Sequence, residues 1–337
     1  MRDHYFLLSF CVSAGVCGAA IYWMLKTGWQ WAIDVPGERS LHARPVLRTG
    51  GLGLIGAVVL SGVVVNAVGG QWPWLETVLA GCLCVISLID DKRGLPVGLR
   101  LAAHVTVASI YVGILFESGR GAGANLPTLV WLPMAVLTIV AMSNFYNFMD
   151  GANGIAGGMT LIGFGAFAAI AGLAHPGLTA LSCALVGSAL GFLPFNWPGR
   201  IFMGDSGSVP LGFLAAAAGL SGWLEHAWSF WLPALVFAPF IVDAGVTLLR
   251  RLLRGERLSQ AHREHYYQRV VRMQVSHGRL ALGEYILMLL CATGALAVSH
   301  LGTVGQVLIV ALTAIVFAAL MLRIDAIWRR QITLQRN

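Results

Sequence analysis

Apolar runs of about membrane-spanning length constrain this chain more than any other feature of its sequence. A helix needs about 20 apolar residues to cross the hydrocarbon core of a bilayer. The 337 residues are 57% hydrophobic and 11% charged, a composition typical of a polytopic membrane protein and not of a soluble domain. We expect an all-α fold with about eleven spans, at 5–25, 50–70, 74–89, 100–117, 128–143, 155–174, 177–194, 207–223, 229–249, 280–299 and 302–322.

The same apolar runs exclude several other classes of protein. The first run, 5–25, is too long for the apolar region of a signal peptide, so we expect it to be the first span. All six cysteines lie inside apolar runs, which favours a packing role over a disulfide framework or a zinc site. Because no loop is long enough to fold alone, residues 1–337 are expected to form a single membrane-embedded domain.

Basic residues lie almost entirely in alternate loops. Of the 22 Lys and Arg, only Arg2 and Arg120 fall outside these loops, when the boundary residue Arg100 is counted with the second. Positive charge marks the cytoplasmic side of a membrane protein, so the N-terminus should face outward and the C-terminus the cytoplasm. The net charge of +7 then reflects orientation, and we expect no nucleic-acid partner. The loops concerned are 26–49, 90–99, 195–206, 250–279 and 323–337.

The stretch Asn144–Gly154, N-F-Y-N-F-M-D-G-A-N-G, lies between two long apolar runs and holds three Asn, one Asp and two Gly. Polar side chains at the end of a span indicate functional work at the membrane edge. One Asp and an Asn carbonyl suit Mg²⁺, which takes few protein ligands besides phosphates and water. An ordinary Asn/Gly turn is the alternative interpretation.

Two further acidic loops fall on the same predicted side. Asp90 and Asp91 are adjacent, and their repulsion requires a shared cation or basic neighbours; a solvated loop start is the alternative. Asp205 lies in F-M-G-D-S-G-S before the eighth run. There it could be a helix N-cap, while the flanking glycines and the helix N-terminus could also admit a phosphate.

Loop 250–279 contains eight arginines and the compact segment H-R-E-H. Binding to lipid headgroups accounts for most of the arginines, but not for the packed histidines. His262, Arg263 and His265 are donors suited to a diphosphate, whereas zinc binding by the two histidines lacks further ligands. Asp243, within a predicted span, is expected to pair with an Arg or a backbone group.

Five motifs in order resemble the polyprenyl-phosphate N-acetylhexosamine-1-phosphate transferase family, over about residues 34–270. The resemblance implies ten or eleven spans with a cytoplasmic active site. The last motif is most similar to enzymes that initiate O-antigen synthesis. The motifs are P-G-E-R-S-L-H-A-R-P-V-L-R-T-G-G, the D-D pair at 90–91, N-F-Y-N-F-M-D-G-A-N-G, F-M-G-D-S-G-S and H-R-E-H-Y-Y-Q.

The resemblance implies transfer of N-acetylhexosamine 1-phosphate, carrying GlcNAc or a deoxy sugar, from a UDP-sugar to undecaprenyl phosphate. The enzyme would lie in the bacterial inner membrane, with the lipid bilayer as a partner. A homodimer is one assembly that the resemblance allows. Mg²⁺, or Mn²⁺ in its place, is expected. The implied roles are metal binding for Asp205 and Asn147, acceptor-phosphate contact or deprotonation for Asp90 and Asp91, and nucleotide-sugar or diphosphate binding for Asn144, Asp150, Asn153, His262, Arg263, His265 and Arg48.

Two rival functions come from other classes. A transporter of a nucleotide sugar or lipid-linked sugar would require internal repeats and broken mid-span helices around a central site. A catalytically inactive membrane scaffold is the second rival, which an assay with labelled UDP-sugars and undecaprenyl phosphate would distinguish. The gathering of polar residues on one predicted side favours the enzyme.

Overall fold

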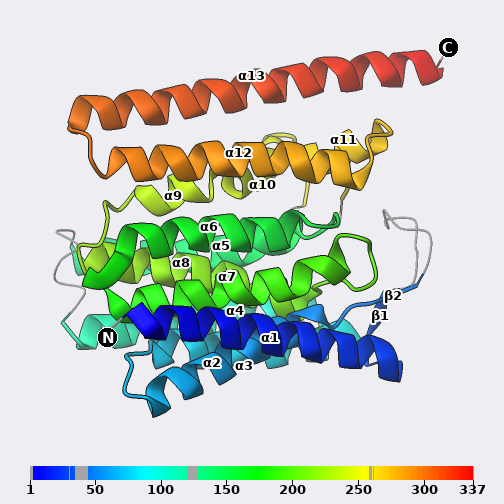
Figure 1. Cartoon of the computed structure of the whole chain (residues 1–337). Helices are drawn as coiled ribbons and strands as arrows, with labels where there is room; N and C mark the ends of the chain where they lie inside the picture. The colour runs from blue at the N-terminus through cyan, green and yellow to red at the C-terminus, as the bar shows by residue number, and fades with distance from the viewer. Residues whose placement is uncertain are drawn as a thin grey trace.

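The computed structural model describes residues 3–29, 31–34, 45–119, 127–257, 260 and 262–336. In this part of the chain the fold is all-α, as predicted, apart from one short two-stranded sheet. The long helices lie side by side in one bundle (Figure 1). Residues 36–44 of the first motif, together with Arg2 and Arg120, lie outside the described residues.

The elements follow one another with short connections. In chain order they are α1 (Asp3–Thr27), β1 (Ile33–Asp34), β2 (Val46–Leu47), α2 (Gly50–Ala67), α3 (Trp74–Arg93), α4 (Val97–Glu117), α5 (Thr128–Met149), α6 (Ile155–Ala171), η2 (Gly172–Ala174), α7 (Pro176–Asn196), α8 (Asp205–Leu224), α9 (Leu232–Val236), α10 (Ala238–Leu253), α11 (Tyr266–Arg272), α12 (His277–Val298) and α13 (Thr303–Arg336).

Each predicted run corresponds to a helix or to a pair of short helices. Within the described ranges, nine helices are long and apolar enough to cross a membrane, namely α1, α2, α4, α5, α6 with η2, α7, α8, α12 and α13. The two remaining runs are α3, whose last turn is charged, and the α9–α10 pair. The chain is therefore a multi-pass membrane protein.

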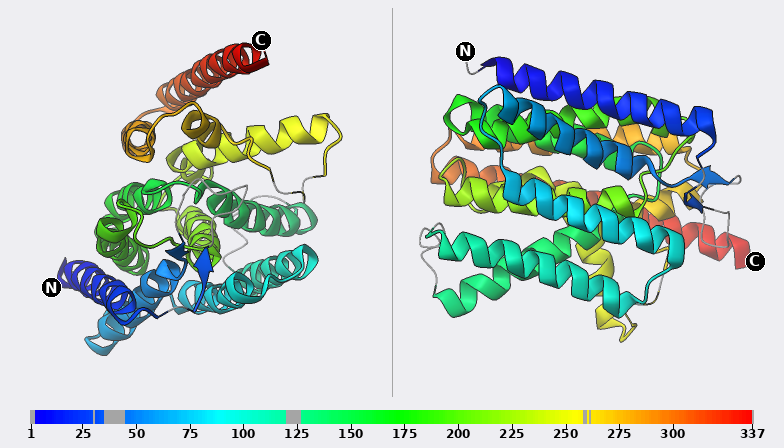
Figure 2. Two further views of the ribbon diagram at one scale, coloured as in Figure 1. Left: turned by 90° about the vertical axis from the view of Figure 1, so that its right-hand side faces the viewer. Right: turned by 90° about the horizontal axis from the view of Figure 1, so that it is seen from below.

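The prediction of one continuous span at 229–249 was wrong. The chain forms α9, breaks at Phe237, and continues as α10. Pro239 has no N–H to donate to the preceding turn and lies in the first turn of α10, a position that favours the start of a new helix. After the break α10 turns away from the bundle axis, as the yellow helix shows in Figure 2.

Several residues predicted as loops belong to helices. Residues 90–93 are in α3, residues 144–149 are in α5, and α13 continues to Arg336. Lys, Arg and Gln favour helix, so a helix need not end where its apolar run ends. Gly94 terminates α3 in the left-handed conformation (φ 66°). Because α5 continues to Met149, Asn144 and Asn147 lie one turn apart on this helix and not in a loop.

Helix α8 forms the centre of the bundle, and nearly all of its residues are buried. It is rich in Gly, Ala and Ser, which allow helices to approach closely within a membrane. A Cβ on Gly51 of α2 would lie only 2.1 Å from the backbone N of Gly207. This close packing fixes the N-terminus of α8, where Asp205 lies.

Candidate active site

A polar cavity of about 290 Å³ lies at one end of the bundle. We call this end, which carries the β1–β2 sheet and the start of α8, the basic end; it is on the right in Figure 1 and faces the viewer in the left panel of Figure 2. Sequence-predicted residues from three separate motifs line it. The lining comprises Asp34, Arg48, Asn147, Asp150, Gly151, Ala152, Asn153, Asn196, Phe202, Gly204, Asp205, Gln268 and His277.

Asp205 is the point at which these motifs meet. Its Oδ1 accepts hydrogen bonds from Arg48 Nη2 (2.5 Å) and Asn147 Nδ2 (2.9 Å). Its Oδ2 lies 3.7 Å from Arg100 Nη1, and the Asn147 amide also donates to Ser208 Oγ at 3.0 Å. Residues 157 and 58 positions distant in the sequence are thus brought to one carboxylate.

Asp91 caps α8 from another helix. Its carboxylate accepts the backbone N–H groups of Asp205 (3.3 Å) and Ser206 (3.2 Å), and it also contacts Arg48 Nε at 3.3 Å. Asp205 is therefore the first helical residue and not the N-cap, which is Gly204 at φ 73°. Two free N–H groups that we expected to admit a phosphate already serve Asp91, because a carboxylate is itself an anion that stabilises a helix N-terminus.

Asp90 turns the other way, toward α4. It is buried, accepts the backbone N–H of Leu95 at 2.6 Å, and pairs with Arg100 Nη1 at 3.1 Å. Since the same Arg100 atom approaches Asp205, this guanidinium joins Asp90 to the centre of the site. Asp90 and Asp91 therefore contact different partners, Arg100 and the N-terminus of α8, and do not act together as one two-carboxylate ligand.

The remaining residues of the 144–154 motif separate into two groups. Asp150 and Asn153 line the cavity, and the backbone N–H of Gly204 donates to the Asp150 carboxylate. Asn144 does not line the cavity; its amide donates to the carbonyl of Val140 at 2.7 Å and lies 3.5 Å from His104 Nδ1 on α4. The structure therefore brings Asp150 and Asn153, but not Asn144, to the cavity.

Negative charge exceeds positive charge around Asp205. Burial raises the pKa of Asp150 well above its usual value, Asp205 and Asp91 raise it further, and Arg48 opposes them. Burial would lower the pKa of Arg48, but the carboxylates, Asp205 foremost, outweigh it and raise that pKa. Crowded carboxylates of this kind are a setting that a divalent cation relieves.

The donor set fits Mg²⁺ better than it fits a closed metal cage. Among the described residues, no group of three His, Cys, Asp or Glu is arranged to hold a metal ion alone. Mg²⁺ commonly takes one or two carboxylates and completes its shell with phosphate oxygens and waters. Asp205, with Asp150 nearby, could supply those carboxylates once a ligand displaces Arg48.

The H-R-E-H segment precedes α11, and Asp243 of α10 fixes the junction. The Asp243 carboxylate accepts the backbone N–H groups of Tyr266 and Tyr267, both at 2.9 Å, and lies 3.3 Å from His265 Nδ1. The buried His265 ring stacks on Phe148 of α5, with ring centroids 5.6 Å apart. Asp243 thus pairs with backbone groups and a histidine, and it orients His265 beside the α5 end of the site.

The other two donors of this segment are held differently. His262 Nδ1 accepts the backbone N–H of Glu264 at 3.3 Å, which leaves Nε2 as the protonated nitrogen. Burial, with His265 and Arg251 nearby, lowers the pKa of His262 to about 4. Arg263 has buried Nε and Nη2 atoms that meet no hydrogen-bond partner within the described chain. Buried guanidinium nitrogens without an acceptor are costly, so Arg263 is a candidate for an incoming anion.

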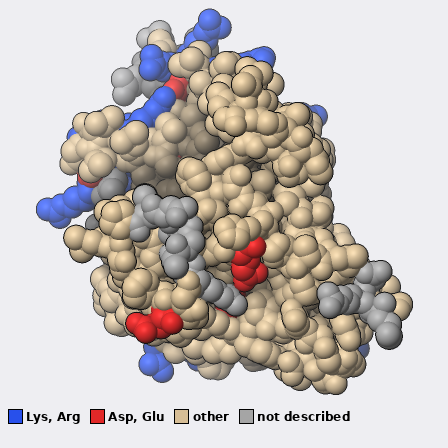
Figure 3. Space-filling view, turned by 90° about the vertical axis from the view of Figure 1, so that its left-hand side faces the viewer, with Lys and Arg blue, Asp and Glu red and all other residues tan. Residues whose placement is uncertain are grey.

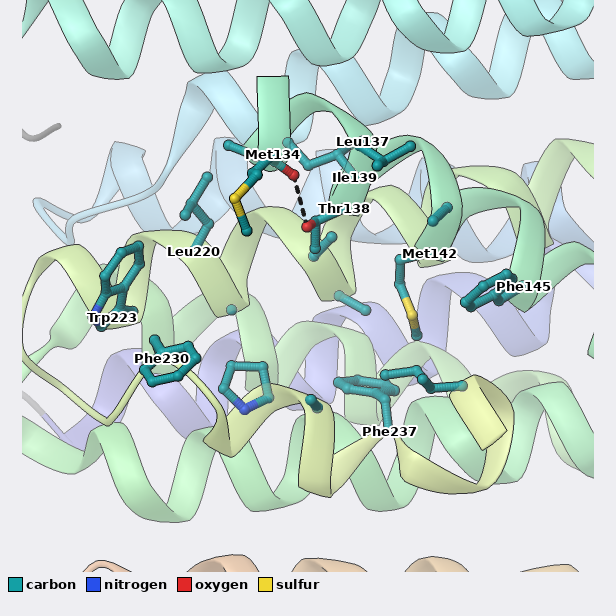
Figure 4. Close-up of a pocket in the computed structure, with 18 of the residues that line it drawn as sticks. Met134, Leu137, Thr138, Ile139, Met142, Phe145, Leu220, Trp223, Phe230 and Phe237 are labelled. Carbon is teal, nitrogen blue, oxygen red and sulfur yellow. Dashed lines mark hydrogen bonds between the residues drawn. The ribbon is translucent and has the colours of Figure 1, made fainter. Parts of the chain in front are cut away.

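An apolar groove of about 730 Å³ lies beside the site, between α5, α8, α9 and α10 (Figure 4). Along α5 it extends from Trp131 to Phe145, which at 1.5 Å per residue is about 21 Å. Phe145 lies next to the helix turn that carries Asn144 and Asn147. The groove therefore leads along the spans to the polar end of α5.

Sequence reasoning missed three contributors to the site. Arg100 was counted only for its charge, Ser208 was given no role, and Gln268 was part of a motif without an assignment. Only for Ser208 does the spacing offer a partial signal. It lies one helical turn after Gly204, and its hydroxyl donates to the Gly204 carbonyl at 3.0 Å. The approach of Arg100 to Asp205 depends on tertiary packing and leaves no local pattern.

Comparison with known proteins finds one family match and several similar enzymes. The glycosyl transferase family 4 model matches residues 74–222. A decaprenyl-phosphate N-acetylglucosaminephosphotransferase of Mycolicibacterium smegmatis is 30% identical over 323 residues, covering 82% of this chain and 79% of the relative. A probable undecaprenyl-phosphate N-acetylglucosaminyl 1-phosphate transferase of Bacillus subtilis is 29% identical, covering 76% and 74%.

A phospho-N-acetylmuramoyl-pentapeptide-transferase of Picosynechococcus is 32% identical over 262 residues, covering 69% of this chain and 68% of the relative. A membrane-embedded bundle with a charged site at one end is the arrangement of an enzyme that works at the bilayer surface. This chain belongs to glycosyl transferase family 4, and it is a membrane transferase of the sugar-phosphate-transferring kind.

Proposed function

We propose that this chain transfers an N-acetylhexosamine 1-phosphate from a UDP-sugar to undecaprenyl phosphate at the cytoplasmic face of a bacterial inner membrane. The observation that carries the proposal is the meeting of Arg48, Asn147 and Arg100 at Asp205, at the end of an apolar groove. Relatives act on undecaprenyl or decaprenyl phosphate. The products are undecaprenyl-diphospho-sugar and UMP, the first membrane step of an O-antigen or another surface polysaccharide.

The reaction joins two anions. An oxygen of the lipid phosphate attacks the β-phosphorus of the UDP-sugar, and the bond from that phosphorus to the bridging oxygen breaks as UMP leaves. In such transfers the protein mainly positions the reactants and stabilises charge. Bound Mg²⁺ or Mn²⁺, on Asp205 with Asn147 or Asp150, would neutralise diphosphate charge.

The arginines have separate tasks in this scheme. Arg48 exchanges its contact with Asp205 for the incoming diphosphate, while Arg263, whose buried Nε and Nη2 atoms have no hydrogen-bond partner among the described residues, pairs with a second phosphate oxygen. Arg100, held by Asp90 at 3.1 Å, faces the acceptor phosphate. A lipid phosphate has its second pKa near 6 and needs little deprotonation, so Asp90 orients Arg100 more than it acts as a base.

The groove of Figure 4 suits the isoprenoid chain of the acceptor. Its lining is apolar and aromatic, with Met134, Met142, Phe230 and Phe237 around the hollow (Figure 4). Methionine adapts to irregular apolar ligands. A lipid seated here would present its phosphate at the Phe145 end, beside the turn that carries Asn147.

A transfer assay tests the proposal. Purified protein, undecaprenyl phosphate, Mg²⁺ and a panel of radiolabelled UDP-N-acetylhexosamines should give label in the organic phase and release UMP. The panel also identifies the sugar. Absence of transfer from every UDP-sugar, in protein that is folded in detergent, would overturn the function and favour the transporter, which labelled uptake into proteoliposomes would detect.

The competing chemistry passes through a covalent aspartyl phosphate. One displacement inverts configuration at phosphorus, whereas two displacements retain it. A UDP-sugar made chiral at the β-phosphorus distinguishes the two routes. We expect inversion, because Asp90 and Asp91 are each held by hydrogen bonds and an arginine and are not presented as free nucleophiles.

A further inference from the structure

The last helix, α13, is buried at few points. Most side chains of its apolar stretch are exposed on the outside of the bundle, as expected of a helix that faces lipid. Two side chains depart from this pattern. Phe317 is 8% exposed and packs with Ala238 and Cys291, and Asp325 is also 8% exposed. A buried carboxylate on a lipid-facing helix requires partners.

Asp325 binds three groups from the neighbouring helices. Its Oδ2 accepts from Arg250 Nη1 of α10 at 2.7 Å, and its Oδ1 accepts from Arg269 Nη1 of α11 at 2.9 Å. The hydroxyl of Tyr266 donates to Oδ2 at 3.3 Å. Both guanidinium groups also lie over the Tyr266 ring, at 5.4 and 5.0 Å from its centroid. One carboxylate therefore joins α10, α11 and α13.

This cluster continues into the H-R-E-H segment. Arg269 Nη2 lies 3.9 Å from Glu264, so Asp325 and Glu264 contact the same guanidinium. Helix α11 has seven residues, too few to be stable without tertiary contacts. Asp243 holds its N-terminus, Tyr267 donates to the carbonyl of Phe148 at 2.9 Å, and Asp325 holds the side that faces α13.

We propose that Asp325 is a positioning residue for the sugar donor. It acts through Arg269 and Tyr266, which fix α11 and, through it, the segment His262–His265 that meets the diphosphate. Without the carboxylate, Arg250 would lose its contact with α13 and Arg269 would keep only the 3.9 Å approach to Glu264, so α11 would shift. The inference rests on the proposed function, and it extends that function to a helix beyond the residues matched by the family and beyond the five motifs.

Steady-state kinetics with both substrates test this role. We expect Asp325→Ala to raise the KM for the UDP-sugar at least tenfold and to leave the KM for undecaprenyl phosphate within twofold of wild type. Asp325→Glu should restore most of the donor affinity. A merely structural role would lower the fraction of active enzyme, and hence the apparent kcat, without separating the two KM values.

Phe317→Ala is the matched control, because it loosens α13 without touching the charged cluster. It should lower the Tm and leave both KM values unchanged. An unchanged donor KM in Asp325→Ala, or the same pattern in Phe317→Ala, would overturn the proposal. If wild-type protein transfers no sugar at all, the proposed function fails instead.

A readout independent of turnover keeps the inference testable. Limited trypsin cleavage after Arg254, whose side chain is 47% exposed, reports how firmly the segment before α11 is held. We expect faster cleavage in Asp325→Ala and in the milder Asp325→Asn, but not in Phe317→Ala. Equal cleavage rates in all four proteins, wild type included, would show that Asp325 does not hold this segment.

Discussion

The two ends of the bundle both bury carboxylates, but they satisfy them with different partners. At the basic end, Asp205 contacts Arg48, Arg100 and an amide. At the opposite end, Glu76 Oε1 accepts from the hydroxyls of Tyr111 (3.1 Å) and Ser221 (3.0 Å). Viewed from that side, acidic side chains show only as small separate patches on a mostly uncharged face (Figure 3).

This difference separates a site from a structural network. Both ends carry a cavity, and the one at the opposite end, at about 810 Å³, is the larger. Volume therefore does not identify the active site. Arginines around a carboxylate can exchange that anion for a phosphate, whereas hydroxyls shared with a buried carboxylate already complete a packed network. Predictions that make the same chemical change at each end test this distinction.

The largest effect is expected when one acid is changed to its amide at the basic end. Asp205→Asn keeps the size of the side chain but removes the charge that holds Arg48 and that would hold the cation in its place. We expect transfer to fall by at least about 10³-fold, with an unchanged elution profile in detergent. The matched change at the opposite end, Glu76→Gln, keeps an acceptor for both hydroxyls and should leave turnover near wild type. Near-normal turnover by Asp205→Asn would remove Asp205 from the site.

A histidine exchange should give the second largest effect. His265→Ala removes the ring that stacks on Phe148 and pairs with Asp243, and we expect activity to fall about 10²-fold without loss of folded protein. His175→Ala, which removes a histidine 3.6 Å from Glu225 at the opposite end, is the control and should be active. Unaffected kinetics in His265→Ala would exclude His265 from catalysis.

Apolar length predicted the helices well because burial in lipid depends on local composition. All eleven runs became helices or a helix pair, and the break in the ninth was not predictable from a proline alone, because α5, α7 and α8 each continue through one. Helix ends were less predictable, since polar residues such as Asp90 and Asn147 can continue a helix beyond the hydrocarbon core.

The site was predictable only in part. Asn147 and Asp205 stand in recognisable motifs, but nothing local shows that the amide of one bonds the carboxylate of the other. The capping of α8 by Asp91 and the contact of Asp325 with Arg250 join residues 114 and 75 positions apart. Such pairings depend on how helices cross, which a hydropathy pattern does not record.

A moderate effect on stability is expected at the opposite end. Glu76→Ala removes the acceptor shared by the Tyr111 and Ser221 hydroxyls, and a lost buried partner of this kind costs about 1–3 kcal/mol. The Tm in detergent should fall, while both KM values remain unchanged. A raised KM for either substrate, at normal stability, would show that the opposite end takes part in the reaction and would break the comparison.

The smallest effect concerns His262, whose pKa burial lowers to about 4. An unfolded histidine titrates near 6.5, so between these values the unfolded chain binds a proton that the native protein does not. Stability from this group is complete above pH 6.5 and is lost as the pH falls toward 4. His262→Asn retains a polar side chain. Between pH 7.5 and pH 5, the Tm of this variant should therefore fall by less than the Tm of the wild type. An equal loss in both proteins would mean that His262 is as accessible to protons in the native segment as in the unfolded chain.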